Sequence, residues 1–121
     1  MSKSIKWLKE PQEKDYPAAG RYLKLTLGPK LARRLVARLH RAKIKKMAAR
    51  DLLRASRTPM SEVRAFDWKS QNKDIKKGKR LSPILLVCAT RDGELLIADG
   101  FHRLCAAFAH DQDAIVRFKI A

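Results

Sequence analysis

The chain has 121 residues, of which 28 are Lys or Arg and 12 are Asp or Glu, so its net charge is +16. This length fits one small domain, and an apolar content of 45% is enough for a packed core, which excludes a wholly disordered chain. The longest apolar run, 83–89, is far shorter than the roughly 20 residues of a membrane-spanning helix. Because residues 1–10 also lack the apolar segment of a secretory signal, we expect a cytoplasmic protein with no membrane partner.

Residues 1–43 are predicted to form a basic arm followed by an amphipathic helix. Two prolines and a glycine interrupt residues 1–20, which favours an irregular arm with no more than one short helical turn, attached to the core by Trp7, Leu8 and Tyr16. Pro29 suits the first turn of a helix over 29–42, because its missing N–H would have no partner there. Apolar residues recur at helical spacing on one face of this helix, and arginines occupy the rest of its surface.

Residues 44–121 are predicted to form the core domain. Residues 44–47 have the character of a short strand, and 48–55 are good helix formers. A proline at position 59 ends that helix, so we expect 58–70 to be a loop or a broken helix with Phe66 and Trp68 as anchors. Gly78 is expected to stop the next helical turn.

The last 39 residues have the clearest pattern. Residues 84–87 are uniformly apolar, as in a strand covered on both faces. A turn at 90–93 leads to a second strand, 95–98, and then to Asp99-Gly100. The apolar spacing of Phe101, Leu104, Cys105 and Phe108 predicts a helix ending near residue 110, and 115–120 reads as a closing strand. The fold class is therefore α/β (α+β), a small mixed sheet with packed helices.

The positive charge is concentrated in the first part of the chain. Residues 1–80 carry 24 basic and 7 acidic residues, a net charge of +17, whereas 81–121 carry 4 and 5, a net charge of −1. Such a surface attracts polyanions by counterion release, although a charged face that only keeps a small protein soluble is the alternative. We expect nucleic-acid contacts from basic residues of the amphipathic helix and the strand after it: Arg33, Arg34, Arg38, Arg41, Lys45 and Lys46.

The most specific candidate site lies where the strand at 95–98 gives way to the following helix. Unpaired backbone N–H groups and the helix dipole favour an anion at such a junction, and Gly100 allows close approach. Arg103 can bind a phosphate with two hydrogen bonds, and His102 can donate a hydrogen bond or move a proton. This interpretation requires an open junction and a guanidinium that is free to meet an anion.

The acidic residue and the cysteines near this junction have structural alternatives. Asp99 is expected to cap the helix, its commoner role, or else to hold His102, Arg103 or a metal. An ion pair with a carboxylate is the structural alternative for Arg103. Cys88 and Cys105 lack the spacing of a zinc site, so we expect two reduced, buried thiols and no bound metal at these residues.

The segments 81–87 and 97–107 together resemble the ParB-like nuclease domain of the ParB/sulfiredoxin superfamily. The resemblance lies in the Pro-Ile strand, the hairpin and the Gly-x-x-Arg-x-x-Ala helix start at Gly100, Arg103 and Ala106, and it extends over 44–121. It implies that Gly100, His102 and Arg103 bind the phosphates of a nucleotide, with a nucleoside triphosphate and Mg²⁺ as the implied cofactors. Partners would be a nucleotide or nucleic acid, and an oligomer is compatible with the family.

The chain also departs from that family in informative ways. Phe101 stands where sulfiredoxin has its nucleophilic cysteine, which argues against sulfinic acid reduction. The downstream motif and helix-turn-helix of the partition proteins have no counterpart before Ala121. Three functions therefore stay open: a stand-alone domain that binds nucleotide or nucleic-acid phosphate, a metal-dependent nuclease or phosphotransferase, and a structural or regulatory partner protein in which the helix start is only well capped. For an enzyme the catalytic candidates are Asp99 and His102, with Glu62 and Asp51 as candidates by location only.

Overall fold

The computed structural model describes residues 4–65, 69–88 and 93–121. Four strands form one mixed sheet in the order β1-β4-β2-β3. β1 pairs with β4 and β2 pairs with β3, both antiparallel, while β2 and β4 run parallel at the centre. The strands are β1 (Lys45–Ala48), β2 (Ile84–Val87), β3 (Leu96–Asp99) and β4 (Ile115–Ile120). The predicted mixed α+β class is thus confirmed, and the predicted strands are shifted by at most one residue.

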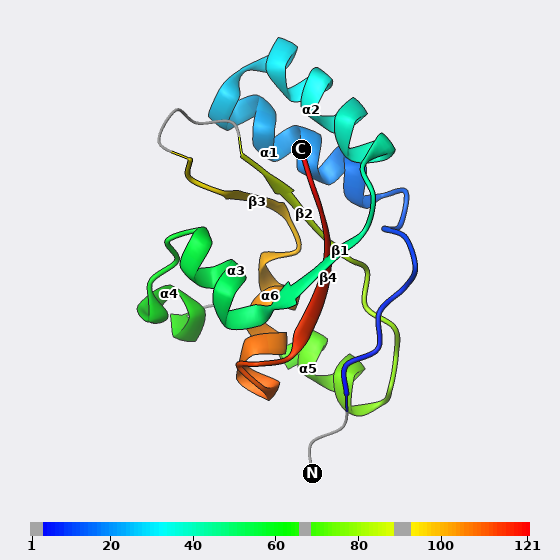
Figure 1. Ribbon diagram of the computed structural model, residues 1–121, viewed down its shortest axis with the longest axis vertical. Helices are drawn as coiled ribbons and strands as arrows, with labels where there is room; N and C mark the ends of the chain where they lie inside the picture. Colours follow the sequence, from blue (N-terminus) through cyan, green and yellow to red (C-terminus); the bar gives the residue numbers. More distant parts are fainter. Residues whose placement is uncertain (1–3, 66–68, 89–92) are drawn as a thin grey trace.

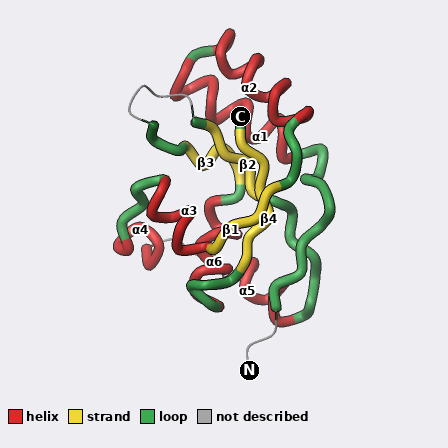
Figure 2. Tube along the Cα trace, in the orientation of Figure 1, coloured by secondary structure: helices red, strands yellow, loops and turns green. Residues whose placement is uncertain are grey.

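Helices cover both faces of this sheet (Figures 1 and 2). Figure 1 shows α1 (Asp15–Leu27) and α2 (Pro29–Arg41) together at one end of the molecule. Toward the other end lie four shorter helices: α3 (Ala49–Ala55), α4 (Met60–Ala65), α5 (Lys69–Lys76) and α6 (Phe101–His110). All four residues of β2 are buried, as expected for a strand covered on both faces.

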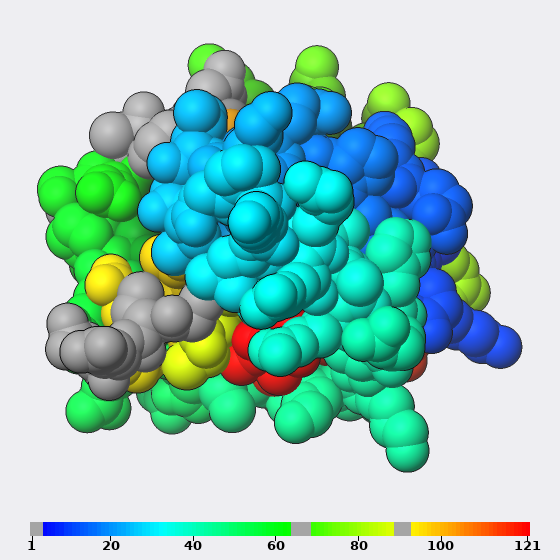
Figure 3. Space-filling model, turned by 90° about the horizontal axis from the view of Figure 1, so that it is seen from above, coloured from blue at the N-terminus to red at the C-terminus, as the bar shows by residue number. Residues whose placement is uncertain are grey.

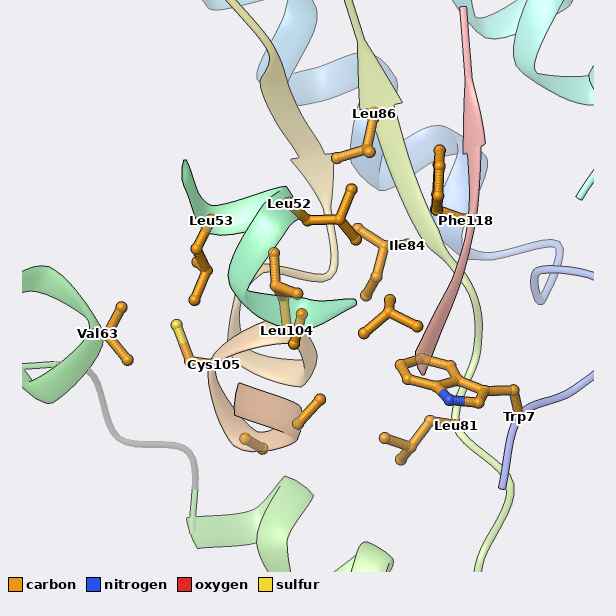
Figure 4. Packing of buried hydrophobic residues seen from close by; sticks show 14 of the residues in the cluster. Trp7, Leu52, Leu53, Val63, Leu81, Ile84, Leu86, Leu104, Cys105 and Phe118 are labelled. Carbon is orange, nitrogen blue, oxygen red and sulfur yellow. The ribbon is translucent and has the colours of Figure 1, made fainter. Parts of the chain in front are cut away.

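α6 packs its predicted apolar face into the larger of two apolar clusters (Figure 4). Leu104 and Cys105 are fully buried there, beside Ile84 of β2 and Leu52 of α3. Burial is the main reason that the pKa of the Cys105 thiol rises to about 11, with a smaller contribution from the Glu62 carboxylate. The expectation of two buried thiols is wrong for Cys88, which is exposed because it follows the last residue of β2, where the chain leaves the sheet.

The second cluster joins α1 and α2 to the opposite face of the sheet, and it corrects the expectation of an irregular arm over residues 1–20. α1 already begins at Asp15, and Pro17 is its third residue, where a missing N–H has no intrahelical acceptor to lose. The buried members of this cluster are Tyr16, Ala19, Leu23, Ala32, Leu35, Leu39, Leu85, Val87 and Ala98.

The arm before α1 is held beside the segment that leads into β2. Leu8 N–H donates to the Leu81 carbonyl at 2.8 Å, and Leu81 N–H donates to the Lys6 carbonyl at 2.8 Å. Trp7 is buried, as predicted, and its ring N–H donates to the Ile115 carbonyl at 3.0 Å. Figure 2 shows this arm as a long loop along one side of the molecule. These contacts place the start of α1 next to Ser82.

The remaining predictions concern the middle of the chain. Within 58–70 the structure has α4 and the start of α5, in line with a broken helix, whereas the anchors Phe66 and Trp68 lie outside the described residues. The same is true of most of the predicted turn at 90–93. Gly78 has a φ of 73° just beyond α5, and its N–H donates to the Ile75 carbonyl at 3.0 Å, which confirms the predicted helix stop.

Candidate functional site

Gly100 forms the junction between β3 and α6 in a left-handed conformation, with φ 101° and ψ 19°. Its carbonyl accepts the first hydrogen bond of the helix, from Leu104 N–H at 3.0 Å. A Cβ at this position would lie 2.7 Å from Ile84 Cδ1 and 2.8 Å from Arg103 Nη2. Glycine is therefore required here by backbone conformation and by packing, and the space beneath it is already filled by protein atoms.

The Arg103 side chain turns inward beneath this junction and pairs with two carboxylates. Its Nη2 donates to Asp99 Oδ2 at 2.9 Å and lies 3.5 Å from Asp15 Oδ2. The Asp15 side chain is only 5% exposed, and the Ser82 hydroxyl donates to the same Oδ2 atom. We call Asp15, Ser82, Asp99 and Arg103 the Arg103 network. The structural alternative for Arg103, an ion pair, is thus what the structure shows. Nη2 of its guanidinium is held by the two carboxylates, so it does not meet an anion at the junction as the phosphate interpretation requires.

Asp99 does not cap α6, so the capping expectation is wrong. Gly100 occupies the N-cap position, and glycine has no side chain with which to cap the helix. The reason is geometric, because the left-handed turn at Gly100 moves the cap one residue further and leaves the Asp99 carboxylate to Arg103. Burial raises the pKa of Asp99, and the facing Arg103 guanidinium offsets that effect only in part.

A cleft of about 500 Å³ opens on the other side of the same junction. Gly100 and the exposed His102 line it, whereas Arg103 does not. Across the cleft lie Ser56 and Thr58, whose hydroxyl oxygens are 2.7 Å apart. The full lining consists of Tyr22, Ser56, Thr58, Glu62 and residues 94–102.

The charge of this cleft comes from acids rather than from bases. Glu62, Glu94 and Asp99 line it, and neither Lys nor Arg is among the lining residues of the described chain. Asp51, the other acid considered from the sequence, is exposed on α3 and does not line it. Within the described ranges no group of three or more His, Cys, Asp or Glu side chains is arranged to hold a metal ion. An anion in this cleft would have to be bound by neutral hydrogen-bond donors, by His102 and by the amino end of α6, or it would have to bind together with a cation.

The predicted nucleic-acid contacts lie on α2 and β1, away from this cleft. We define the α2–β1 basic face by its eight exposed cations, Lys30, Arg33, Arg34, Arg38, Arg41, Lys43, Lys45 and Lys46. Figure 3 shows α2 in cyan and the residues after it in blue-green, side by side on one face of the molecule. In the part of the chain that the structure describes, none of these eight cations forms an ion pair.

Sequence reasoning missed two members of the Arg103 network, Asp15 and Ser82. They are 67 residues apart in the sequence and meet only because the arm runs beside the segment before β2. The available signal was an acid directly before Tyr16-Pro17, since acids and proline are both common in the first turn of a helix. With α1 recognised, a buried carboxylate at its first turn would have called for a cationic partner.

Comparison of the chain with protein-family models, with curated proteins and with solved structures found no match. The described helices include none that is both long enough and apolar enough to cross a membrane.

Proposed function

We propose that this protein binds a nucleotide, or a nucleic-acid phosphate, in the cleft at the amino end of α6. One observation carries the proposal: the first turn of α6, with Gly100 and His102, shares the cleft with the hydroxyl pair of Ser56 and Thr58. The first turn of α6 offers N–H donors to phosphate oxygens, and the helix dipole adds positive potential. The Ser56 hydroxyl donates to the Leu53 carbonyl at 3.0 Å, so the hydroxyl that turns to donate to a phosphate oxygen is that of Thr58, which gives up its bond to Ser56. The ParB-like resemblance leads to the same junction, and kinship with that superfamily is part of the proposal.

The residues of the site have different roles from those expected if Arg103 itself bound the phosphate. Gly100 and His102 contact the phosphate, whereas Arg103 acts from below as a positioning residue that holds Asp99 and closes the space under Gly100. The carboxylates of Glu62, Glu94 and Asp99 repel a bare triphosphate. We therefore expect a nucleotide to bind together with Mg²⁺, whose charge offsets these carboxylates.

The test is a thermal-shift screen over nucleoside triphosphates, with and without Mg²⁺, followed by calorimetric titration. A nucleotide at 100 times its dissociation constant should stabilise the protein by about 2.7 kcal/mol. His102→Ala and Thr58→Val should each weaken binding, because each removes a donor on one side of the cleft. His110→Ala, at the opposite end of the same helix, is the matched control and should leave affinity unchanged. The proposal is wrong if no nucleotide raises the melting temperature under either condition.

The α2–β1 basic face gives the second part of the proposal, a non-specific affinity for nucleic acid. The supporting observation is that its eight exposed cations have no carboxylate partner within the described ranges. Unpaired cations release counterions when they meet phosphates, and this release drives non-specific binding.

A further inference from the structure

A second cavity lies beside Arg103 and shares no lining residue with the cleft. It has a volume of about 360 Å³ and is bounded by the amino end of α1, by α5 and by the segment before β2. Its lining includes Lys14, Gln71, Asp74, Lys79, Arg80 and Arg103. We call it the α1–α5 cavity. Ser82 and Arg103 of the Arg103 network line this cavity, whereas Asp99 of the same network lines the cleft. The network therefore lies between the cavity and the cleft.

The α1–α5 cavity has an excess of positive charge. Four of its lining residues are cations, and Asp74 is the single acid among the residues that line it in the described chain. Lys79 lies 3.8 Å from Asp74, and Arg103 pairs with Asp15 and Asp99. For Lys14 and Arg80 the described residues provide no carboxylate partner. Two cations are therefore left for a ligand.

The hydrogen-bonding groups of this cavity are also incomplete. Across residues 4–65, 69–88 and 93–121, two buried side-chain polar atoms have no partner within the protein: Arg103 Nε and Gln71 Oε1. Both residues line the α1–α5 cavity. Buried polar atoms are nearly always hydrogen-bonded, so two exceptions at one cavity point to a group that binds there. The first atom is a donor and the second is an acceptor, which means that the group must both accept and donate.

We propose that the α1–α5 cavity binds a tetrahedral oxyanion that retains one O–H group, which is the chemistry of inorganic phosphate or of a phosphomonoester. An ionised oxygen accepts from Arg103 Nε, the remaining O–H donates to Gln71 Oε1, and Lys14 and Arg80 balance the negative charge. Sulfate has the same shape but carries no proton near neutral pH, so it can satisfy Arg103 but not Gln71.

The experiment compares sodium phosphate, sodium sulfate and glycerol phosphate as ligands of the full chain, by calorimetric titration at constant ionic strength. It is run at about pH 6, where about half of a phosphomonoester keeps its proton. Phosphate should bind saturably and about tenfold more tightly than sulfate, the difference expected for one hydrogen bond within a charged group. Binding of glycerol phosphate would identify a monoester as the source, and binding of phosphate alone would identify the free ion.

Variants separate this site from the other parts of the protein. Gln71→Met should lower phosphate affinity to the level of sulfate, because it removes the acceptor and keeps the length of the side chain. Lys14→Gln with Arg80→Gln should weaken both anions, whereas the charge-matched pair Lys76→Gln with Lys77→Gln, outside the cavity lining, should weaken neither. His102→Ala should not affect phosphate binding here, so failure of the nucleotide proposal can be recognised independently.

Three results would overturn the proposal. The first is that neither anion binds saturably, as expected if only water fills the cavity. The second is equal affinity for phosphate and sulfate, and the third is an unchanged affinity in the Lys14→Gln, Arg80→Gln variant.

Discussion

Arg103 illustrates how a residue that sequence reasoning assigns to a ligand can be required by the protein itself. Its guanidinium is the common partner of Asp15 and Asp99, whose side chains are 5% and 18% exposed. Removing the cation leaves two largely buried carboxylates without their counter-charge, which is far more costly than the net contribution of the intact pair. A loss of ligand binding in an Arg103 variant would therefore not by itself identify a phosphate contact.

We predict that Arg103→Ala lowers the free energy of unfolding by about 3 kcal/mol in the absence of any ligand. Urea unfolding followed by circular dichroism measures the change. Arg50→Ala is the control, because Arg50 pairs with Asp113 at the surface with side chains 57% and 60% exposed, and its loss should cost less than about 1 kcal/mol. Equal losses in the two variants would show that the Arg103 network does not stabilise the fold.

Gly100 gives a second prediction at the scale of one residue. Gly100→Ala adds a Cβ both to a left-handed backbone and to a position 2.7 Å from Ile84 Cδ1, so it should destabilise the unliganded protein by about 2 kcal/mol or more. Gly78→Ala isolates the backbone effect, since its φ is 73° and the nearest atom to its Cβ is Lys6 Nζ at 3.9 Å. That control should lose about 1 kcal/mol. Thermal unfolding of both variants makes the comparison, and a smaller loss for Gly100→Ala would contradict the packing seen at the junction.

At the scale of elements, the helices and strands that could be predicted are those whose buried residues form a regular apolar pattern in the sequence. α2 presents three buried residues at helical spacing, and β2 is buried on both faces, so the pattern of each identifies it without knowledge of its partners. α6 was predicted to its final residues for the same reason, with Gly100 marking its start. The junction between β3 and α6, and with it the place of the candidate site, was therefore predictable.

α1 was not predictable in this way, because its apolar residues form no sustained helical pattern in the sequence and Gly20 lies in its interior. The helix forms because its buried face packs against α2 and the sheet; this face consists of Tyr16, Ala19 and Leu23. Its stability therefore comes from tertiary packing, which the helix propensities of its residues do not reveal. The Arg103 network could not be predicted from the sequence for the same reason, because one of its carboxylates, Asp15, belongs to α1. The direction in which Arg103 points depends on an element that the sequence pattern did not reveal.

At the scale of the whole molecule, folding separates the acidic residues from the α2–β1 basic face. Five carboxylates form ion pairs in the described part of the chain, those of Glu10, Asp15, Asp74, Asp99 and Asp113. All five pair with cations outside α2 and β1, and one of them, Glu10, pairs with the buried Lys119 of β4. Eight of the 28 Lys and Arg residues are therefore exposed on the α2–β1 basic face, without a carboxylate partner in the described ranges.

The α2–β1 basic face predicts the salt dependence of nucleic-acid binding. Arg34, Arg38 and Arg41 share the solvent-facing side of α2, opposite the buried Ala32, Leu35 and Leu39. Each cation that meets a duplex phosphate contributes about 0.9 to the slope of the logarithm of affinity against the logarithm of salt concentration. Replacing all three by Gln should therefore reduce that slope by roughly 2 to 3, measured by fluorescence anisotropy of a labelled duplex over a salt series.

The triple variant of Lys73, Lys76 and Lys77 to Gln removes the same charge from exposed sites elsewhere and should change the slope by less than about 1. If both triple variants reduce the slope equally, affinity follows total charge and α2 is not the contact surface; if neither does, nucleic acid does not bind through this face.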